Sequence, residues 1–250
     1  MPVCDLECGT LTHEFIGPVR IIVVDDDEYF TKIFKLAILM FVYVLMGMLL
    51  AVPALYYLDF TVEWQNIAHV LFGILICQCL IPIGVLSHNP SVLSTAPMRP
   101  ADRMDQHIKL QAIACFFLFC TSIVARFINS SRADNRIHRV TGDVTVFFCI
   151  MTALIGALIR VWDWDCFGLK QKPLFIIGHK VLGFLTVTFC TLTYITGIST
   201  WRFTEHLPLR VQDNFKFVLT ILGFIYTAVI IYFPVMKFFE EQDLKRPTRL

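Results

Sequence analysis

Charged residues are scarce in this chain. They account for 16% of its 250 residues, whereas a soluble domain has about 25%. Hydrophobic residues account for 56%. These proportions exclude an ordinary soluble protein and predict a protein that lies in a lipid bilayer. An excess of charge of one sign is lacking too, because the net charge is only +1. No overall field therefore points to nucleic acid or to an acidic partner. We expect no nucleic acid, and for an acidic partner the local distribution of charge must decide.

Two familiar motifs are also missing. A signal peptide begins with basic residues and soon becomes apolar, but here the acidic run 25–28 precedes the first long apolar segment. The motif C-x-x-C-H, which attaches haem covalently, does not occur. Any haem would therefore be held by coordination alone. Most of the nine cysteines lie inside apolar segments, where we expect them to pack as small hydrophobic side chains.

Six hydrophobic segments are long enough to cross a bilayer, which needs about 20 apolar residues. They cover residues 34–58, 64–86, 106–128, 137–161, 175–199 and 215–233. We therefore predict an all-α membrane protein with six transmembrane helices. Its organisation would be an N-terminal tail over residues 1–33, a transmembrane domain over 34–236 and a C-terminal tail over 237–250. A homodimer is left open.

Lysine and arginine are unevenly divided between the two sides of this topology. The side that holds both termini has fourteen of them and the other side has seven. Cytosolic loops carry the excess of basic residues. Both termini are therefore predicted to be cytosolic, in a multi-pass protein of the plasma membrane or of an endomembrane vesicle.

Four histidines stand near the starts of the second to fifth segments, namely His69, His107, His138 and His179. A histidine within a membrane helix is costly and is by default a sign of function. Since the helices alternate in direction, His69 and His138 would lie toward the outer face, and His107 and His179 toward the cytosol. Helices two and four are diagonal neighbours in a four-helix bundle, as are three and five. Each diagonal would bring two imidazoles together.

Glycine follows three of these histidines at a distance of four residues, at Gly73, Gly142 and Gly183. Residues i and i+4 share a helix face, so each glycine would clear a flat space beside an imidazole, as a porphyrin requires. Gln111 stands at the fourth such position. We predict two haem b groups in the bundle of helices two to five, each with two histidine ligands and no open coordination position. Such an iron transfers electrons, and the two irons would be about 15–20 Å apart.

The segments around these histidines resemble the cytochrome b561 family over residues 65–201. The resemblance rests on the phrases NIAHVLFG, MDQHIKLQ, RIHRVTGD and IGHKVLGF, and on the spacing of the four histidines along the chain. Family members are six-span oxidoreductases with two haems on this diagonal arrangement. The resemblance implies electron transfer from cytosolic ascorbate to monodehydroascorbate or a ferric chelate on the other side, which is a ferric reductase type of activity.

Cationic residues near the two histidine pairs are candidates for substrate contacts. On the cytosolic side the family often has a basic residue just before the third-helix histidine, whereas this chain has Asp105 and Gln106 there. The nearby cations are Arg103, Lys109 and Lys180, which would hold the ascorbate anion, contact haem propionates or anchor helix ends in the headgroups. The outer cations are Arg132, Arg136 and Arg139, which bracket His138 as an acceptor site or as propionate contacts.

Other polar residues have weaker patterns. Asp143, early in the fourth segment, is a candidate hydrogen-bond partner near the outer haem. His88 follows the second segment at its cytosolic end and is expected to be solvated, as are His13 and His206. Two rival functions stay open. One is a haem b anchor subunit of a quinol-linked dehydrogenase, and the other is a haem-free six-span transporter or scaffold whose histidines make polar contacts between helices.

Overall fold

The computed structural model describes residues 26–57, 64–88, 98–127, 136–161, 172–200 and 209–243, which form helices and short turns. In chain order the helices are α1 (Asp26–Tyr57), α2 (Trp64–Ile74), the π-helix η2 (Leu75–Leu80), α3 (Ile81–Leu86), α4 (Pro100–Phe127), α5 (Arg136–Val161), α6 (Lys172–Ile198) and α8 (Leu209–Asp243). Six stretches are long and apolar enough to cross a membrane, with α2, η2 and α3 forming one span, Trp64–Leu86. The prediction of an all-helical, multi-pass membrane protein is confirmed.

The helices extend beyond the predicted hydrophobic segments. α1 begins at Asp26, α4 at Pro100, and α8 continues to Asp243. Hydropathy marks the part of a helix that lies in hydrocarbon, whereas polar turns at its ends can stay helical in the headgroup region. The start of α4 has suitable residues for this, because proline is favoured at the first helical position and Asp102 lies in the first turn, where its charge opposes the helix dipole.

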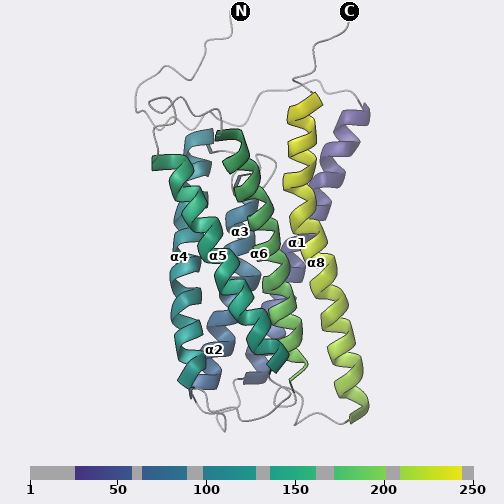
Figure 1. Ribbon diagram of the computed structural model, residues 1–250. Coiled ribbons are helices and arrows are strands. Elements are labelled where there is room, and N and C mark those ends of the chain that lie inside the picture. The colour runs from purple at the N-terminus through teal and green to yellow at the C-terminus, as the bar shows by residue number, and fades with distance from the viewer. Residues whose placement is uncertain are drawn as a thin grey trace, which may run out of the picture.

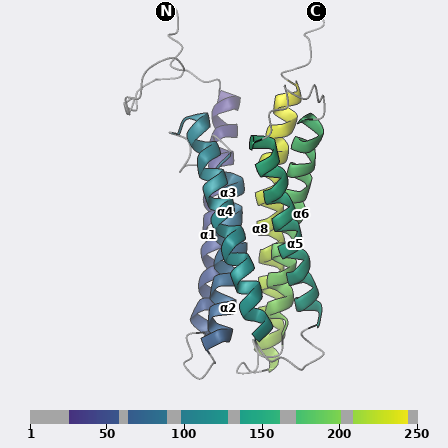
Figure 2. The same ribbon diagram turned by 60° about the vertical axis from the view of Figure 1, so that its left-hand side comes forward.

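Four spans close a ring of neighbours. The span α2–α3 packs against α4, α4 against α5, α5 against α6, and α6 returns to η2. α2 and α5 are thus opposite members of the ring, as are α4 and α6, which is the diagonal relation expected from the order of the spans. Figure 1 shows α2–α6 together, and Figure 2 shows α2–α4 on one side and α5 and α6 on the other.

The first and last helices pack against each other on the outside of this ring. α1 also contacts α2 and η2, while α8 contacts α3 and α6. The start of α1 and the end of α8 lie at the same end of the molecule (Figure 1). Apolar side chains of both helices are buried, among them Leu45 and Leu49 on α1 and Ile230 on α8. Two tyrosine hydroxyls tie these outer helices to the ring, because Tyr226 on α8 donates to the Gln78 carbonyl of η2 at 2.5 Å, and Tyr194 on α6 donates to the Leu49 carbonyl of α1 at 3.2 Å.

Threonine pairs join α5 to α6 along their length. The hydroxyls of Thr145 and Thr193 are 2.8 Å apart, and those of Thr152 and Thr186 are 3.2 Å apart. Hydroxyl contacts of this kind stabilise helix pairs in a membrane, where there is no water to compete for the donor. The carbonyls of these two helices are therefore held in a fixed register, which matters for the histidines below.

Free cysteines meet in pairs across the ring. Cys77 on η2 lies near Cys190 on α6, and Cys115 on α4 lies near Cys149 on α5. Cys77, Cys149 and Cys190 are buried. Their packing agrees with the expected role as small hydrophobic side chains.

Candidate functional site

The four histidines of the ring meet in two pairs. His69 on α2 and His138 on α5 have ring centroids 6.0 Å apart, with the ring planes at 78°. His107 on α4 and His179 on α6 have ring centroids 6.2 Å apart, also at 78°. Each pair joins opposite members of the ring of spans. These are the same two pairs that the alternating direction of the helices predicts.

Three of the four imidazoles are held by a backbone carbonyl of a neighbouring helix. Nδ1 of His107 lies 2.7 Å from the Gly84 carbonyl, that of His138 lies 3.0 Å from the Thr193 carbonyl, and that of His179 lies 3.0 Å from the Thr152 carbonyl. A carbonyl only accepts, so Nδ1 must carry the proton and Nε2 keeps its lone pair. This is how metal-binding histidines are usually oriented.

His69 is the exception. Its Nδ1 is buried, and the backbone of Thr121 on α4 lies near it. The approach does not meet hydrogen-bond geometry, so this nitrogen is unpaired.

The acceptors reveal an internal register that the sequence analysis missed. Each acceptor lies on the span that carries a histidine of the other pair. α5 and α6 exchange contacts, and the span that ends in α3 supplies the acceptor for His107 on α4. His138 precedes Thr152 by 14 residues and His179 precedes Thr193 by 14. Fourteen residues are about 21 Å of α-helix. This length separates the two histidine pairs along the helix axes.

The second span uses one residue more to cover the same distance, from His69 to Gly84. The π-helix η2 lies between them, with the Ile81 amide donating to the carbonyl of Ile76, five residues earlier. A π-turn accommodates one residue more than an α-turn. This extra residue restores the register, so the Gly84 carbonyl still reaches His107.

Two glycines missed by the sequence analysis make room for the imidazoles. A Cβ added at Gly197 would lie 3.0 Å from Cε1 of His138, and one at Gly156 would lie 2.9 Å from Cε1 of His179. Both distances are shorter than ordinary contacts, so these histidines pack directly on a bare helix backbone. The signal in the sequence is the repeated T-x-x-x-G of Thr152–Gly156 and Thr193–Gly197.

The predicted glycines have open space beside them. Nothing lies within 4 Å of a Cβ added at Gly73, and a Cβ at Gly142 or Gly183 would meet only a threonine methyl group at 3.9 Å. This is compatible with the predicted role of clearing a flat space. The fourth position is different, because Gln111 does not face such a space. Its Nε2 donates to the Ile81 carbonyl at 3.0 Å and packs on Gly84, so it ties α4 to α3.

The donor set and its spacing fit a haem iron. A bond of about 2 Å from Nε2 to a metal, plus about 1 Å from Nε2 to the ring centre, places the centroids of two opposite ligands about 6 Å apart. The observed values are 6.0 and 6.2 Å. Within the described ranges, no group of three or more His, Cys, Asp or Glu side chains is placed to hold a bare metal ion. A haem iron needs only two axial ligands from the protein, and each pair supplies two.

His88 is partly buried against another imidazole, so the prediction of a solvated ring was wrong. Its ring centroid lies 5.0 Å from that of His107, with the planes at 48°. The hydrophobic segment ends at Leu86, but the chain continues in a turn through Ser87, whose backbone N–H still bonds to the Ile83 carbonyl. Burial is the main cause that lowers the pKa of His88 to about 4, and His107, Lys237 and Arg103 act in the same direction. The ring is therefore neutral at pH 7. His13 and His206 lie outside the described residues.

The cations predicted for the cytosolic face differ in how close they lie to the pair His107 and His179, called here the inner pair. Arg103 precedes His107 by one helical turn and shares its face, and Lys180 lies close enough to His179 to act on it electrostatically. Lys109 is exposed, and two residues along a helix do not face the same way. Lys237 on α8 was not predicted, yet its Nζ donates to the His88 carbonyl at 3.2 Å.

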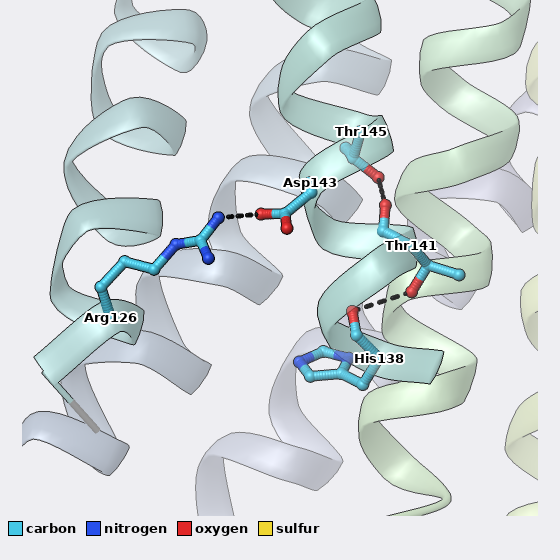
Figure 3. Close-up of polar contacts among 5 residues, drawn as sticks. All are labelled: Arg126, His138, Thr141, Asp143 and Thr145. Atoms are coloured by element: carbon cyan, nitrogen blue, oxygen red, sulfur yellow. Dashed lines mark hydrogen bonds and ion pairs between the residues drawn. The ribbon is translucent and has the colours of Figure 1, made fainter. Parts of the chain in front are cut away.

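Two ion pairs link α4 to α5, one at each end. Arg126 contacts Asp143 at 2.6 Å, and Arg160 contacts Asp105 at 3.3 Å. Figure 3 shows Asp143 reaching toward Arg126 on α4, and the Thr141 hydroxyl donating to the His138 carbonyl. Asp143 thus has an arginine partner. Asp105, which departs from the family pattern, has one as well.

The cations predicted for the outer face flank one of the histidine pairs, His69 and His138. Arg136 and Arg139 are exposed on α5 on either side of His138. Arg132 lies outside the described residues.

Comparison with protein-family models, with curated proteins and with solved structures finds no match for this chain.

Proposed function

We propose that this protein transfers electrons across a membrane through two haem b groups, held by His69 and His138 at the outer face and by His107 and His179 at the cytosolic face. The supporting observation is the geometry of the histidines. Two imidazole pairs have the spacing of opposite axial ligands, and three of the four Nδ1 atoms are bonded to carbonyls so that Nε2 is available. A transporter or scaffold would have no need of this repeated arrangement.

Each haem would supply an iron that accepts and gives up one electron without binding a substrate. The protein's own groups do the rest. The carbonyls of Gly84, Thr152 and Thr193 fix the tautomer and the rotation of the rings. The bare backbone at Gly156 and Gly197 lets each ring lie against its neighbouring helix. The apolar spans exclude water, and the repeated register between histidine and acceptor keeps the two sites at opposite faces.

Direction and substrates form the second part of the proposal. The excess of lysine and arginine on the side of the termini makes that side cytosolic. Arg103 and Lys180 would form a cationic rim for an anionic electron donor, with ascorbate proposed from the resemblance to the cytochrome b561 family. Arg136 and Arg139 would attract a ferric chelate or monodehydroascorbate at the outer face. The quinol-linked anchor subunit is the alternative that keeps the haems and replaces the donor.

The test uses the full chain reconstituted into lipid vesicles that are loaded with ascorbate. Ferricyanide, a ferric complex that does not cross lipid, is added outside and its absorbance is followed. We expect its reduction at a rate proportional to the amount of incorporated protein. Protein-free vesicles measure leakage, and His69→Ala is the matched variant, since it removes one ligand of the outer pair and leaves both faces otherwise unchanged.

Three results contradict parts of the proposal. No haem in the purified protein would refute electron transfer and favour the transporter or scaffold. Haem that a short-chain quinol reduces and ascorbate does not would favour the quinol-linked anchor. Equal rates in wild type and His69→Ala would show that electrons do not pass through the outer pair.

A further inference from the structure

The turn that follows α3 holds one imidazole against the inner histidine pair. The ring of His88 packs on His107 with 5.0 Å between centroids. The turn is fixed on both sides, because the Ser87 hydroxyl donates to the Gly84 carbonyl at 2.7 Å and Lys237 donates to the His88 carbonyl at 3.2 Å. The Gly84 carbonyl is also the acceptor for Nδ1 of His107. One short segment therefore both anchors the His107 ring and covers it.

The other three histidines lack such a neighbour at the matching place. His88 follows the acceptor residue Gly84 by four positions. The residues four positions after Thr152 and Thr193 are Gly156 and Gly197, which leave room for the imidazole. The residue four positions after Thr121 is an alanine. The two pairs are thus built alike except at this corner, where an aromatic ring replaces a small residue.

We propose that His88 is a positioning residue for the inner haem, and that its ring fixes the rotation of the His107 imidazole and thereby separates the reduction potential of the inner haem from that of the outer one. This inference rests on the proposed function. The groups around a ligand set its orientation and basicity, and with them the potential of the metal. A ring packed on one ligand only is a direct way to make two otherwise similar sites unequal.

Two substitutions separate ring packing from other roles. His88→Ala removes the ring, and His88→Phe keeps a flat ring without its nitrogens. Each variant is purified with its haems, which are counted per chain, then examined by electron paramagnetic resonance of the ferric state and by redox titration. The inner signal is identified as the one that survives in His138→Ala. The outer haem of the same molecules is the internal control.

We expect His88→Ala to keep two haems, to change the ferric resonance of the inner haem, and to shift its reduction equilibrium by roughly tenfold, which is 59 mV for a one-electron couple. The outer haem should not change, and His88→Phe should restore the inner haem toward wild type. Loss of the inner haem alone in His88→Ala, with recovery in His88→Phe, has the same meaning. If His88→Ala loses both haems, His88→Phe decides, because a wild-type inner resonance supports ring packing.

Two results overturn the inference. The first is a His88→Ala protein with both resonances and both potentials unchanged. The second is an inner haem altered in His88→Phe, whatever His88→Ala does, which would exclude ring packing as the cause. A wild-type chain without haem would refute the proposed function together with this inference, whereas either result above refutes the inference alone.

Discussion

Gly197→Ala should weaken the outer haem site without weakening the fold. The added Cβ would lie 3.0 Å from Cε1 and 3.3 Å from Nδ1 of His138, and ordinary contact begins at 3.4 Å. The imidazole must therefore retreat by a few tenths of an ångström. Metal–ligand distances are held within about 0.2 Å. The Thr193 carbonyl, 3.0 Å from Nδ1, resists a larger rotation, so the displacement falls on the atom that would bind iron.

The expected size of the effect follows from two opposing terms. Loss of a group that orients a metal ligand typically costs about 10–100-fold in affinity. The second effect is on the backbone and has the opposite sign, because alanine in place of glycine inside a helix stabilises the helix by about 0.5–1 kcal/mol. Gly47→Ala isolates the backbone term, since nothing lies within 4 Å of the Cβ that it would add on α1.

The assay is haem release from the purified protein to an excess of apomyoglobin, followed by absorbance. Gly197→Ala should release its outer haem about 10–100 times faster than wild type, with the inner haem as the reference in the same sample. Gly47→Ala should release both at the wild-type rate. An outer haem that leaves Gly197→Ala as slowly as wild type would refute the inferred contact between His138 and the helix backbone.

The remaining predictions concern ligand pairing and two polar groups. His107→Ala or His179→Ala should remove only the inner haem, and His69→Ala or His138→Ala only the outer one, as counted by haem per chain; loss that ignores these pairs would rule out the diagonal arrangement. Gln78 is fully buried, and neither polar atom of its side chain has a hydrogen-bond partner. Burying an unpaired polar group usually costs about 1–3 kcal/mol of stability, so Gln78→Leu should raise the midpoint temperature of thermal unfolding. A lower midpoint would mean that the amide has a partner. Asp143→Asn should change the free energy of unfolding by less than about 1 kcal/mol and leave the haem content unchanged, because both side chains of the Arg126–Asp143 ion pair are about half exposed. Loss of the outer haem would instead assign Asp143 to that site.

Hydropathy and the alternation of the helices were enough to predict the spans and the histidine pairs. Apolar length fixes which segments can cross a bilayer, and an even number of crossings between histidines fixes which of them share a face. The distances within the pairs needed the structure, because they depend on how the diagonal helices approach each other.

The residues that orient the histidines could not be predicted in the same way. Their acceptors are backbone carbonyls, such as those of Thr152 and Thr193, and a carbonyl has no signature in a sequence. The glycines sought were those on the histidine's own helix, whereas Gly156 and Gly197 act from the neighbouring helix. The position of His88 depends on a turn beyond the hydrophobic segment, where hydropathy gives no information.

The π-helix was hidden for a related reason. The second span has ordinary hydrophobic residues through most of Leu75–Leu80, so nothing in its composition indicates a wider turn. The role of the π-helix follows only from a comparison of sequence spacings, since His69 and Gly84 are one residue further apart than His138 and Thr152. Once the spacing between a histidine and the acceptor on the same span is known, one extra residue in that spacing indicates a π-turn in the sequence.

The most direct test of two bis-histidine haems is the absorption spectrum of the purified protein in detergent, oxidised and then fully reduced with dithionite, with haem counted per chain. We expect two haem b per chain and a sharp low-spin α band on reduction. The reduced protein should not bind carbon monoxide, because no coordination position is open. A colourless protein, a single haem per chain, or a five-coordinate iron that binds carbon monoxide would contradict this expectation.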